Sequence, residues 1–330
     1  MAESTGAERI RIPTAATPAG PDGREAVVDT PSQAPDTATE TFVAHRNLLF
    51  TVAYEMLGSA ADAEDVLQET WLRWAGVDLD TVNDQRAYLV RITTRQALNR
   101  LRTMSRRKEA YVGQWLPEPL ITAPDVAEDV ELAESMSMAM MLVLETLGPT
   151  ERAVFVLREV FGLDYEEIAA AVDKTPAAVR QIAHRSRKHV DARRPRQAVS
   201  VSEARAAVES FQRAFETGDL QGLLDVLAPE VVYMGDGGGI KHAALRPVVG
   251  ALHVARLFTG MTGKAGKAGI RLSFAPTMVN GTPALAVHAD GELDGVIAVR
   301  VDDTRISGLY FVRNPEKLSH VDTETTPTLR

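Results

Sequence analysis

The apolar positions of residues 164–190 recur every three or four residues, in two short segments separated by a polar turn. This period is typical of two amphipathic helices that pack against each other. The second helix is expected to turn five residues inward: Val179, Ile182, Ala183, Ser186 and Val190. Two such helices form the outline of a helix-turn-helix, which places its second helix in the DNA major groove.

Local chemistry marks the ends of both helices. Asp164 can cap the first helix, and Glu167, three residues later, can complete a capping box. Thr175 is a suitable N-cap for the second helix, and Pro176 follows at the first helical position, where proline is tolerated. An ordinary helical hairpin with a solvated basic face is the alternative interpretation.

The outward side of the second helix carries cations and amides. Arg180 and Gln181 are placed to reach base edges, whereas Arg185 and Lys188, further along, are better placed for phosphates. The predicted DNA-binding residues of this helix and its N-cap are Thr175, Arg180, Gln181, His184, Arg185, Arg187 and Lys188.

Three earlier apolar stripes predict three helices between about residues 42 and 111. Gly58 and Ser59 break the first from the second. Trp71 and Trp74 lie on the apolar side of the second helix, so they are expected in the core. The third helix is expected from about residue 84 to residue 103.

The later half of that third helix is strongly basic. No acidic residue stands between Arg91 and Lys108, and polar side chains alternate with the cations. Cations neutralise phosphates, while aromatic and amide groups stack on or bond to exposed bases. A solvated basic face is the alternative. The predicted nucleic-acid residues are Arg91, Arg95, Asn99, Arg102, Arg106 and Arg107.

The segment after the basic helix is acidic and contains prolines. No Lys or Arg occurs between residues 116 and 135, which predicts a linker. Helices are expected to resume near Met136. From residue 202 two helical patterns precede five strand-like runs, separated later by Asn-Gly and Asp-Asp turns. Helices followed by an antiparallel sheet indicate an α+β domain.

Composition limits the chemistry. The chain has 330 residues, a formal net charge of −9 and no cysteine, which excludes disulfides, thiolate zinc sites and cysteine nucleophiles. The seven histidines lack metal-ligand spacing. No apolar run is long enough to cross a bilayer, and no secretion signal is visible. We therefore expect a cytoplasmic protein with no cofactor, no metal and no membrane partner.

Residues 42–192 resemble an extracytoplasmic-function sigma factor, built from sigma regions 2 and 4 alone. Residues 62–70 (DAEDVLQET) resemble the region 2 segment that docks on RNA polymerase. Residues 86–92 (RAYLVRI) and the basic helix after them resemble the part that melts and reads the −10 element. Residues 149–162 and the helix-turn-helix resemble region 4, which reads the −35 element.

This resemblance implies core RNA polymerase and promoter DNA as partners, and no catalytic activity. It assigns polymerase docking to an acidic helix face that would otherwise be interpreted as a solvated helix start. The residues concerned are Asp62, Glu64, Asp65, Gln68 and Glu69.

Residues 202–318 resemble a SnoaL-like domain of the cone-shaped NTF2-like fold, which SigJ-type sigma factors carry at the C-terminus. Three motifs support this: Trp-Leu-Pro-Glu-Pro at 115–119, Asp-Gly-Gly-Gly at 236–239 and Asn-Pro-Glu-Lys-Leu at 314–318. Ile240 separates the glycines from Lys241, which departs from the subgroup's motif. The expected regulatory contacts are Trp115, Pro117, Asp236, Gly237, Gly238, Gly239, Asn314, Pro315 and Lys317.

The expected architecture is therefore multi-domain, with two all-α sigma domains followed by an α+β NTF2-like cone. We expect a disordered tail (1–40), region 2 (41–112), an acidic linker (113–135), region 4 (136–196), the SnoaL-like domain (202–318) and a C-terminal tail (319–330). The resemblance implies that the SnoaL-like domain replaces a separate anti-sigma factor; its pocket ligand is unknown. The alternatives are a one-component ligand-sensing regulator and an isomerase or cyclase.

Overall fold

The computed structural model describes residues 37–123, 130–193, 199–319, 321 and 327–328. The expected N-terminal tail lies outside these ranges, except that its last residues, 37–40, already belong to the first helix. The tail boundary at residue 40 was thus too late, because Ala38 and Phe42 are buried and hold this first turn in the core.

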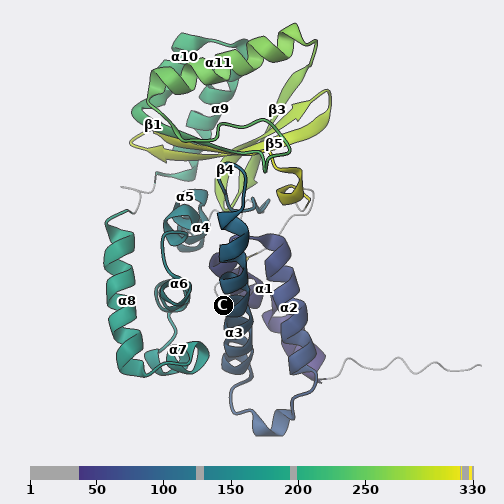
Figure 1. The fold of residues 1–330 in the computed structure, drawn as a ribbon, viewed down its shortest axis with the longest axis vertical. Coiled ribbons are helices and arrows are strands. Elements are labelled where there is room, and N and C mark those ends of the chain that lie inside the picture. Colours follow the sequence, from purple (N-terminus) through teal and green to yellow (C-terminus); the bar gives the residue numbers. More distant parts are fainter. Residues whose placement is uncertain (1–36, 124–129, 194–198, 320, 322–326, 329–330) are drawn as a thin grey trace, which may run out of the picture. The chain divides into compact units, whose positions relative to one another are not determined.

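Three long helices form the N-terminal part (Figure 1): α1 (Thr37–Leu57), α2 (Ala60–Trp74) and α3 (Gln85–Glu109), with the short η1 (Leu79–Thr81) between the last two. Ser59 caps α2 by accepting a hydrogen bond from the Asp62 amide. Trp74 is fully buried and donates its indole N–H to the Ala38 carbonyl at 2.8 Å, which confirms its core position. Trp71 is half-buried and packs on this core.

The next helices are α4 (Val130–Met136), α5 (Met138–Leu144), α6 (Pro149–Phe155), the π-helical turn η3 (Val156–Val160), α7 (Tyr165–Val172) and α8 (Pro176–Asp191). Helix resumes at Val130, inside the expected linker. Both predicted caps are confirmed: Asp164 and Glu167 form a capping box, and the Thr175 hydroxyl accepts from the Ala178 amide at 3.3 Å. All five predicted inward residues of α8 are buried.

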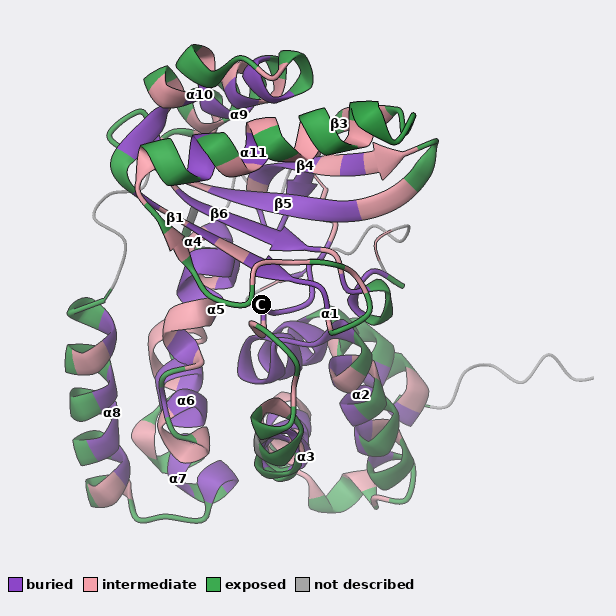
Figure 2. Ribbon diagram, turned by 45° about the horizontal axis from the view of Figure 1, so that its top comes forward, coloured by how far each residue is buried: buried purple, intermediate pink, exposed green. Residues whose placement is uncertain are grey.

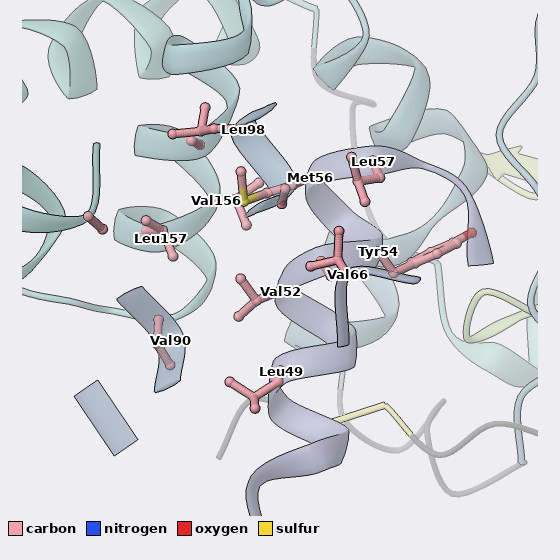
Figure 3. Close-up of a cluster of buried hydrophobic side chains, with 14 of the residues drawn as sticks. Leu49, Val52, Tyr54, Met56, Leu57, Val66, Val90, Leu98, Val156 and Leu157 are labelled. Carbon is pink, nitrogen blue, oxygen red and sulfur yellow. The ribbon is translucent and has the colours of Figure 1, made fainter. Parts of the chain in front are cut away.

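The two helical parts share one core. Val52 and Met56 of α1 lie among Val90 and Leu98 of α3 and Val156 of η3 (Figure 3). Because one apolar cluster is continuous across both parts, separating them would expose buried side chains to water.

The C-terminal part contains α9 (Val201–Thr217), α10 (Leu220–Val226), α11 (Ala251–Lys267) and the short η4 (Pro315–Lys317). Its strands are β1 (Leu227–Asp236), β2 (Val248–Val249), β3 (Leu272–Val279), β4 (Thr282–Ala289), β5 (Glu292–Asp302) and β6 (Arg305–Val312). They form one sheet in the order β2-β1-β6-β5-β4-β3. Together the helices and the sheet make the expected α+β domain.

The sheet differs from the prediction in one pairing: β1 runs parallel to β6. The remaining chain of the domain connects these two strands, so no tight turn forces them to be antiparallel. Helix α11 and strand β2 were also missed. Three glycines, Gly260, Gly263 and Gly266, weaken the helical signal of α11, whereas burial of Val254, Ala255 and Phe258 stabilises it.

The sheet is covered on both faces (Figure 2). Helices α9 and α11 pack on one face through Phe211, Phe215 and Phe258. The opposite face buries Leu116 of the linker and Met138 of α5 in a second apolar cluster. The sheet thus contacts both the linker and α5 of the second helical part.

Candidate functional site

Helix α8 presents its predicted DNA-binding residues to solvent. Gln181, His184, Arg185 and Lys188 are exposed, and their side chains bond to none of the described residues. The exposed N-cap Thr175 precedes them. This surface is open to a nucleic-acid backbone.

Two arginines of α8 have acidic neighbours. Arg187 donates two hydrogen bonds to the Glu159 carboxylate, at 2.9 Å from its Nε and 2.5 Å from its Nη2. Arg180 lies 3.8 Å from Glu166 across a highly exposed pair. Arg187 is therefore less available for DNA than Lys188, a distinction that spacing along the helix does not reveal.

The basic face of α3 is partly engaged. Arg95 donates to the Ala170 carbonyl of α7 at 2.9 Å, which ties this helix to the helix-turn-helix. The Arg91 guanidinium lies 4.7 Å from the ring centre of Tyr88. The remaining predicted residues, Asn99, Arg102, Arg106 and Arg107, are exposed.

The acidic residues of α2 are largely paired within the chain. Asp62 and Asp65 both bind Arg100 of α3, and the Asp62 oxygen lies 2.8 Å from the Arg100 Nε. Glu64 pairs with Arg46 of α1 at 2.7 Å. Glu69 accepts from Gln96 at 2.9 Å, and Gln68 is exposed. Spacing along the sequence did not identify Arg46, Arg100 and Gln96 as the partners of these acids, because they lie on other helices.

A second site joins the linker to the C-terminal domain, and we call it the linker cluster: Tyr111, Trp115, Leu116, Asp236, Asn314 and Lys317. Asp236 is fully buried. Its Oδ2 accepts from the Lys317 Nζ at 2.7 Å and from the Leu116 amide at 2.9 Å. Its Oδ1 accepts from the Tyr111 hydroxyl, which in turn accepts from Asn314 Nδ2 at 2.9 Å.

Lys317 contacts the linker directly, as well as Asp236. Its ammonium also donates to the Leu116 carbonyl at 2.6 Å and lies 3.4 Å from the Trp115 ring centre. Burial lowers its pKa, while the Asp236 carboxylate opposes that shift. Both charges are removed from water, so loss of either partner would leave a buried unpaired charge.

The glycines after Asp236 are required by close approach. Gly238 has a φ of +63°, and a Cβ there would collide with Asn314. A Cβ at Gly237 would collide with the Lys241 carbonyl, and one at Gly239 would meet Val112 at 3.1 Å. Of the expected contact residues outside the cluster, Pro117 is buried and Pro315 is exposed at the start of η4.

Lys241 does not join the linker cluster. Its ammonium binds Asp294 at 3.0 Å instead.

Glu118 fixes the linker to α2. Its carboxylate accepts from the Ser59 hydroxyl at 2.8 Å and from the amides of Ala60 and Ala61 at 2.7 and 3.2 Å. These amides open a helix and otherwise lack intrahelical acceptors. Burial raises the pKa of Glu118, and the Ser59 hydrogen bond opposes that rise.

A buried polar chain continues from Glu118 to the sheet. The Tyr54 hydroxyl of α1 donates to the Glu118 carbonyl at 2.6 Å and accepts from Asn280 Nδ2 at 2.7 Å. The same Asn280 amide donates to the Met136 carbonyl at 2.9 Å. Asn280, which the sequence marks only as a turn residue, thus contacts both helical parts.

The two helical parts also meet through buried charges. Arg152 of α6 donates to the Glu55 carbonyl of α1 at 2.9 Å and pairs with Glu145 at 2.7 Å. Glu145 also binds Lys108 of α3. Glu55 is fully buried, which raises its pKa to about 7, although a hydrogen bond from Ser135 opposes the rise. No sequence motif pointed to this network.

Among the described residues, no helix is long and apolar enough to cross a membrane. Within the same ranges, no group of three or more histidine or acidic side chains could hold a metal ion.

Comparison with known proteins agrees with this geometry. Sigma-70 region 2 matches residues 41–107, and Sigma-70, region 4 matches residues 137–190. The ECF RNA polymerase sigma factor SigJ of Mycobacterium tuberculosis is 34% identical over 289 residues, covering 84% of this chain and 92% of SigJ. The probable ECF RNA polymerase sigma factor SigI of the same species is 30% identical over 292 residues, covering 88% and 97%.

A solved structure resembles this chain over most of its length. The crystal structure of Mycobacterium tuberculosis SigJ has a TM-score of 0.69 at 32% sequence identity. The match covers 85% of this chain and 98% of that structure. The likeness therefore includes the C-terminal domain as well as the two helical parts.

Proposed function

Because the chain belongs to the extracytoplasmic-function sigma factors of the sigma-70 family, we propose that it binds core RNA polymerase and directs promoter-specific initiation in the cytoplasm. It is not an enzyme of its own. We assign region 2 to residues 41–112, the linker to 113–135, region 4 to 136–196 and the SnoaL-like regulatory domain to 202–318.

Region 4 reads the −35 element with α8. The exposed cations and amides of this helix support the assignment. So do the N-cap Thr175 and the following Pro176, which begin the helix. Arg180 and Gln181 contact base edges, while Arg185 and Lys188 contact phosphates. Arg187 contributes less to DNA binding, because Glu159 already binds its guanidinium.

Region 2 reads and melts the −10 element with the exposed part of α3. The residues that carry this role are Arg91, Arg95, Asn99, Arg102, Arg106 and Arg107. The exposed edge of α2, with Gln68 and Glu69, contacts polymerase together with Asp62, Glu64 and Asp65. In the isolated chain, Arg46 and Arg100 neutralise three of those carboxylates.

The C-terminal domain holds the sigma regions closed and takes the place of a separate anti-sigma factor. One observation carries this proposal: the buried Lys317–Asp236 pair of the domain holds the linker, because Asp236 accepts from the Leu116 amide and Lys317 donates to the Leu116 carbonyl. A sigma factor needs regions 2 and 4 on separate DNA elements. The shared apolar core, the Arg152 bond to Glu55 and the Arg95 bond to α7 hold them together, so a factor that is active must release this arrangement.

Transcription in vitro tests both parts of the proposal. Purified core polymerase should initiate at a defined set of promoters only when this protein is added. Failure to bind polymerase, combined with tight binding to duplex promoter DNA, would contradict the sigma assignment and favour a one-component regulator.

A point variant isolates the regulatory part. Lys317→Met should raise initiation about fivefold or more, because loss of one to two kcal/mol of closure shifts the closed population by that factor. Lys241→Met is the matched control, since Lys241 pairs with Asp294 within the same domain. Equal transcription from both folded variants and the unmodified protein would refute control by the linker cluster.

A further inference from the structure

A cavity of about 540 Å³ lies inside the C-terminal domain, between α11 and the sheet. Its walls are mostly apolar and include Leu257, Met261, Ile270, Leu272 and Val287. Cavities of ~300–1,000 Å³ with apolar walls and a few polar groups are typical of sites for small organic molecules. None of the described residues of region 2, the linker or region 4 lines it.

Tyr233 supplies a polar anchor in this cavity. The residue is only 2% exposed, and its hydroxyl bonds to none of the described residues. Phe258 holds its ring edge-to-face at a centroid distance of 5.5 Å. Because Tyr233 lines the cavity, its hydroxyl can donate a hydrogen bond to a ligand oxygen bound there.

The charged groups around the cavity favour an anion. Asp294 is the one acidic residue among the described lining residues, and both of its oxygens are already bound by Arg313, at 2.8 and 3.0 Å. Lys241 adds a second cation to the same carboxylate. Arg256 and Lys264 of α11 also line the cavity, and their side chains pair with none of the described residues.

The cavity wall is continuous with the linker cluster. His242, Ala243 and Ala244 line the cavity, and the Ala244 carbonyl accepts from Gln114 of the linker at 3.0 Å. Arg313 donates its Nη1 proton to the His242 carbonyl, while its backbone amide donates to the Asp236 carbonyl at 2.7 Å. A ligand that moves Arg313 or this loop therefore acts directly on Asp236.

We propose that this cavity binds a small amphipathic organic anion, an apolar body that carries a carboxylate, and that its occupancy changes how tightly the linker cluster holds the linker. The carboxylate lies near Arg313, Arg256 and Lys264, with Tyr233 donating a hydrogen bond. The effect of the ligand on the linker rests on the proposed regulatory function. Binding of the anion in the cavity is independent of that function.

Calorimetric titration of the full chain with decanoate, below its micelle concentration, tests the binding. Decanoate should bind about tenfold or more tightly than decyltrimethylammonium, which has the same apolar tail and the opposite charge. Gly260→Phe should weaken decanoate binding at least tenfold, because Gly260 lines the cavity and a Cβ there meets open space. Tyr233→Phe should weaken binding by a smaller factor.

Gly263→Phe is the matched control. Gly263 lies on the same helix and also has open space around it, but it does not line the cavity. This variant should bind decanoate like the unmodified protein. No decanoate binding, equal binding by the Gly260→Phe and Gly263→Phe variants, or preference for the cationic probe would overturn the proposal.

Amide hydrogen exchange tests the coupling without polymerase. Saturating decanoate should change the exchange rate of the Leu116 amide, which bonds to Asp236, by about fivefold or more. The Gly260→Phe variant should show no such change. Binding with an unchanged Leu116 exchange rate would refute the coupling. Because neither assay involves transcription, their results are independent of whether the chain works as a sigma factor.

Discussion

The two basic helices α3 and α8 have similar compositions but different surroundings. On α8, Lys188 and Arg185 are exposed and pair with none of the described residues. On α3, Arg100 is held by two acids of α2, and Arg95 bonds to the backbone of α7. Both helices offer exposed cations, but Arg95 of α3 bonds to the other helical part, whereas the paired Arg187 of α8 is held by Glu159 of its own part.

This difference indicates an order of events. Region 4 can approach duplex DNA with the closed chain intact, since α8 faces outward. The proposed contact of Arg95 with a phosphate or a base requires its bond to the Ala170 carbonyl of α7 to open first. We infer that the closed chain restricts −10 recognition more than −35 recognition.

Arg152→Met should weaken the packing of region 4 against region 2, and with it the difference between the two basic helices. Arg152 is 2% exposed and bonds to both Glu55 and Glu145, so its loss leaves a buried carboxylate with one fewer cation. Removal of one partner of such a pair typically costs about 3–5 kcal/mol. Denaturant unfolding should show this loss, whereas Arg205→Met, at an exposed position of α9, should change stability little.

Glu55→Gln should remove a pH dependence of the closed state. Burial raises the pKa of Glu55 from its ordinary 4.5 to about 7, so the folded chain prefers the protonated form. The contribution of Glu55 protonation to the stability of the folded chain is fully present below pH 4.5, and it is lost as the pH rises to about 7. The loss is at most about 1.4 kcal/mol per pH unit. Thermal unfolding between these pH values should decline for the unmodified protein and stay flatter for the variant.

Arg180→Ala should change the sequence preference of region 4 and leave that of region 2 unchanged. A base contact is worth about 1–3 kcal/mol of discrimination. Competition binding with −35 sequences altered one base at a time should show relaxed preference at one position. Arg102→Ala, on α3, should leave that −35 preference unchanged; the same relaxation in both variants would contradict the assignment.

Lys188→Ala should have the smallest effect and no sequence dependence. A single phosphate contact lowers the salt slope of DNA binding by about one when it is removed. Fluorescence anisotropy over a range of salt concentrations measures this slope. Arg187→Ala should lower it less, because Glu159 already binds that guanidinium. A larger effect for Arg187 than for Lys188 would show that the Glu159 pair opens on DNA.

Local features of the fold could be predicted well from the sequence. The capping box at Asp164, the Thr175 cap and the inward face of α8 depend on residues within one or two helical turns of each other. The motifs around Trp115, Asp236 and Asn314 could be singled out by resemblance. That they meet in one cluster came from the structure, and their regulatory role stays a prediction.

Other features had no local signal. Asn280 contacts Tyr54 across 226 positions of the chain, and Arg152 reaches Glu55 across 97. The parallel pairing of β1 with β6 likewise joins distant segments. The sequence around a buried arginine can look the same as the sequence around a solvated one. The spacing of residues along the chain therefore could not identify these partners.

The sequence alone determined where α7 and α8 begin, which of their faces are apolar and where positive charge gathers along the chain. These properties follow from backbone capping and from the periodicity of side chains along one element. The tertiary structure decided which charges stay available. Desolvation and pairing depend on what each side chain meets in space, and those partners come from elements far apart in the chain.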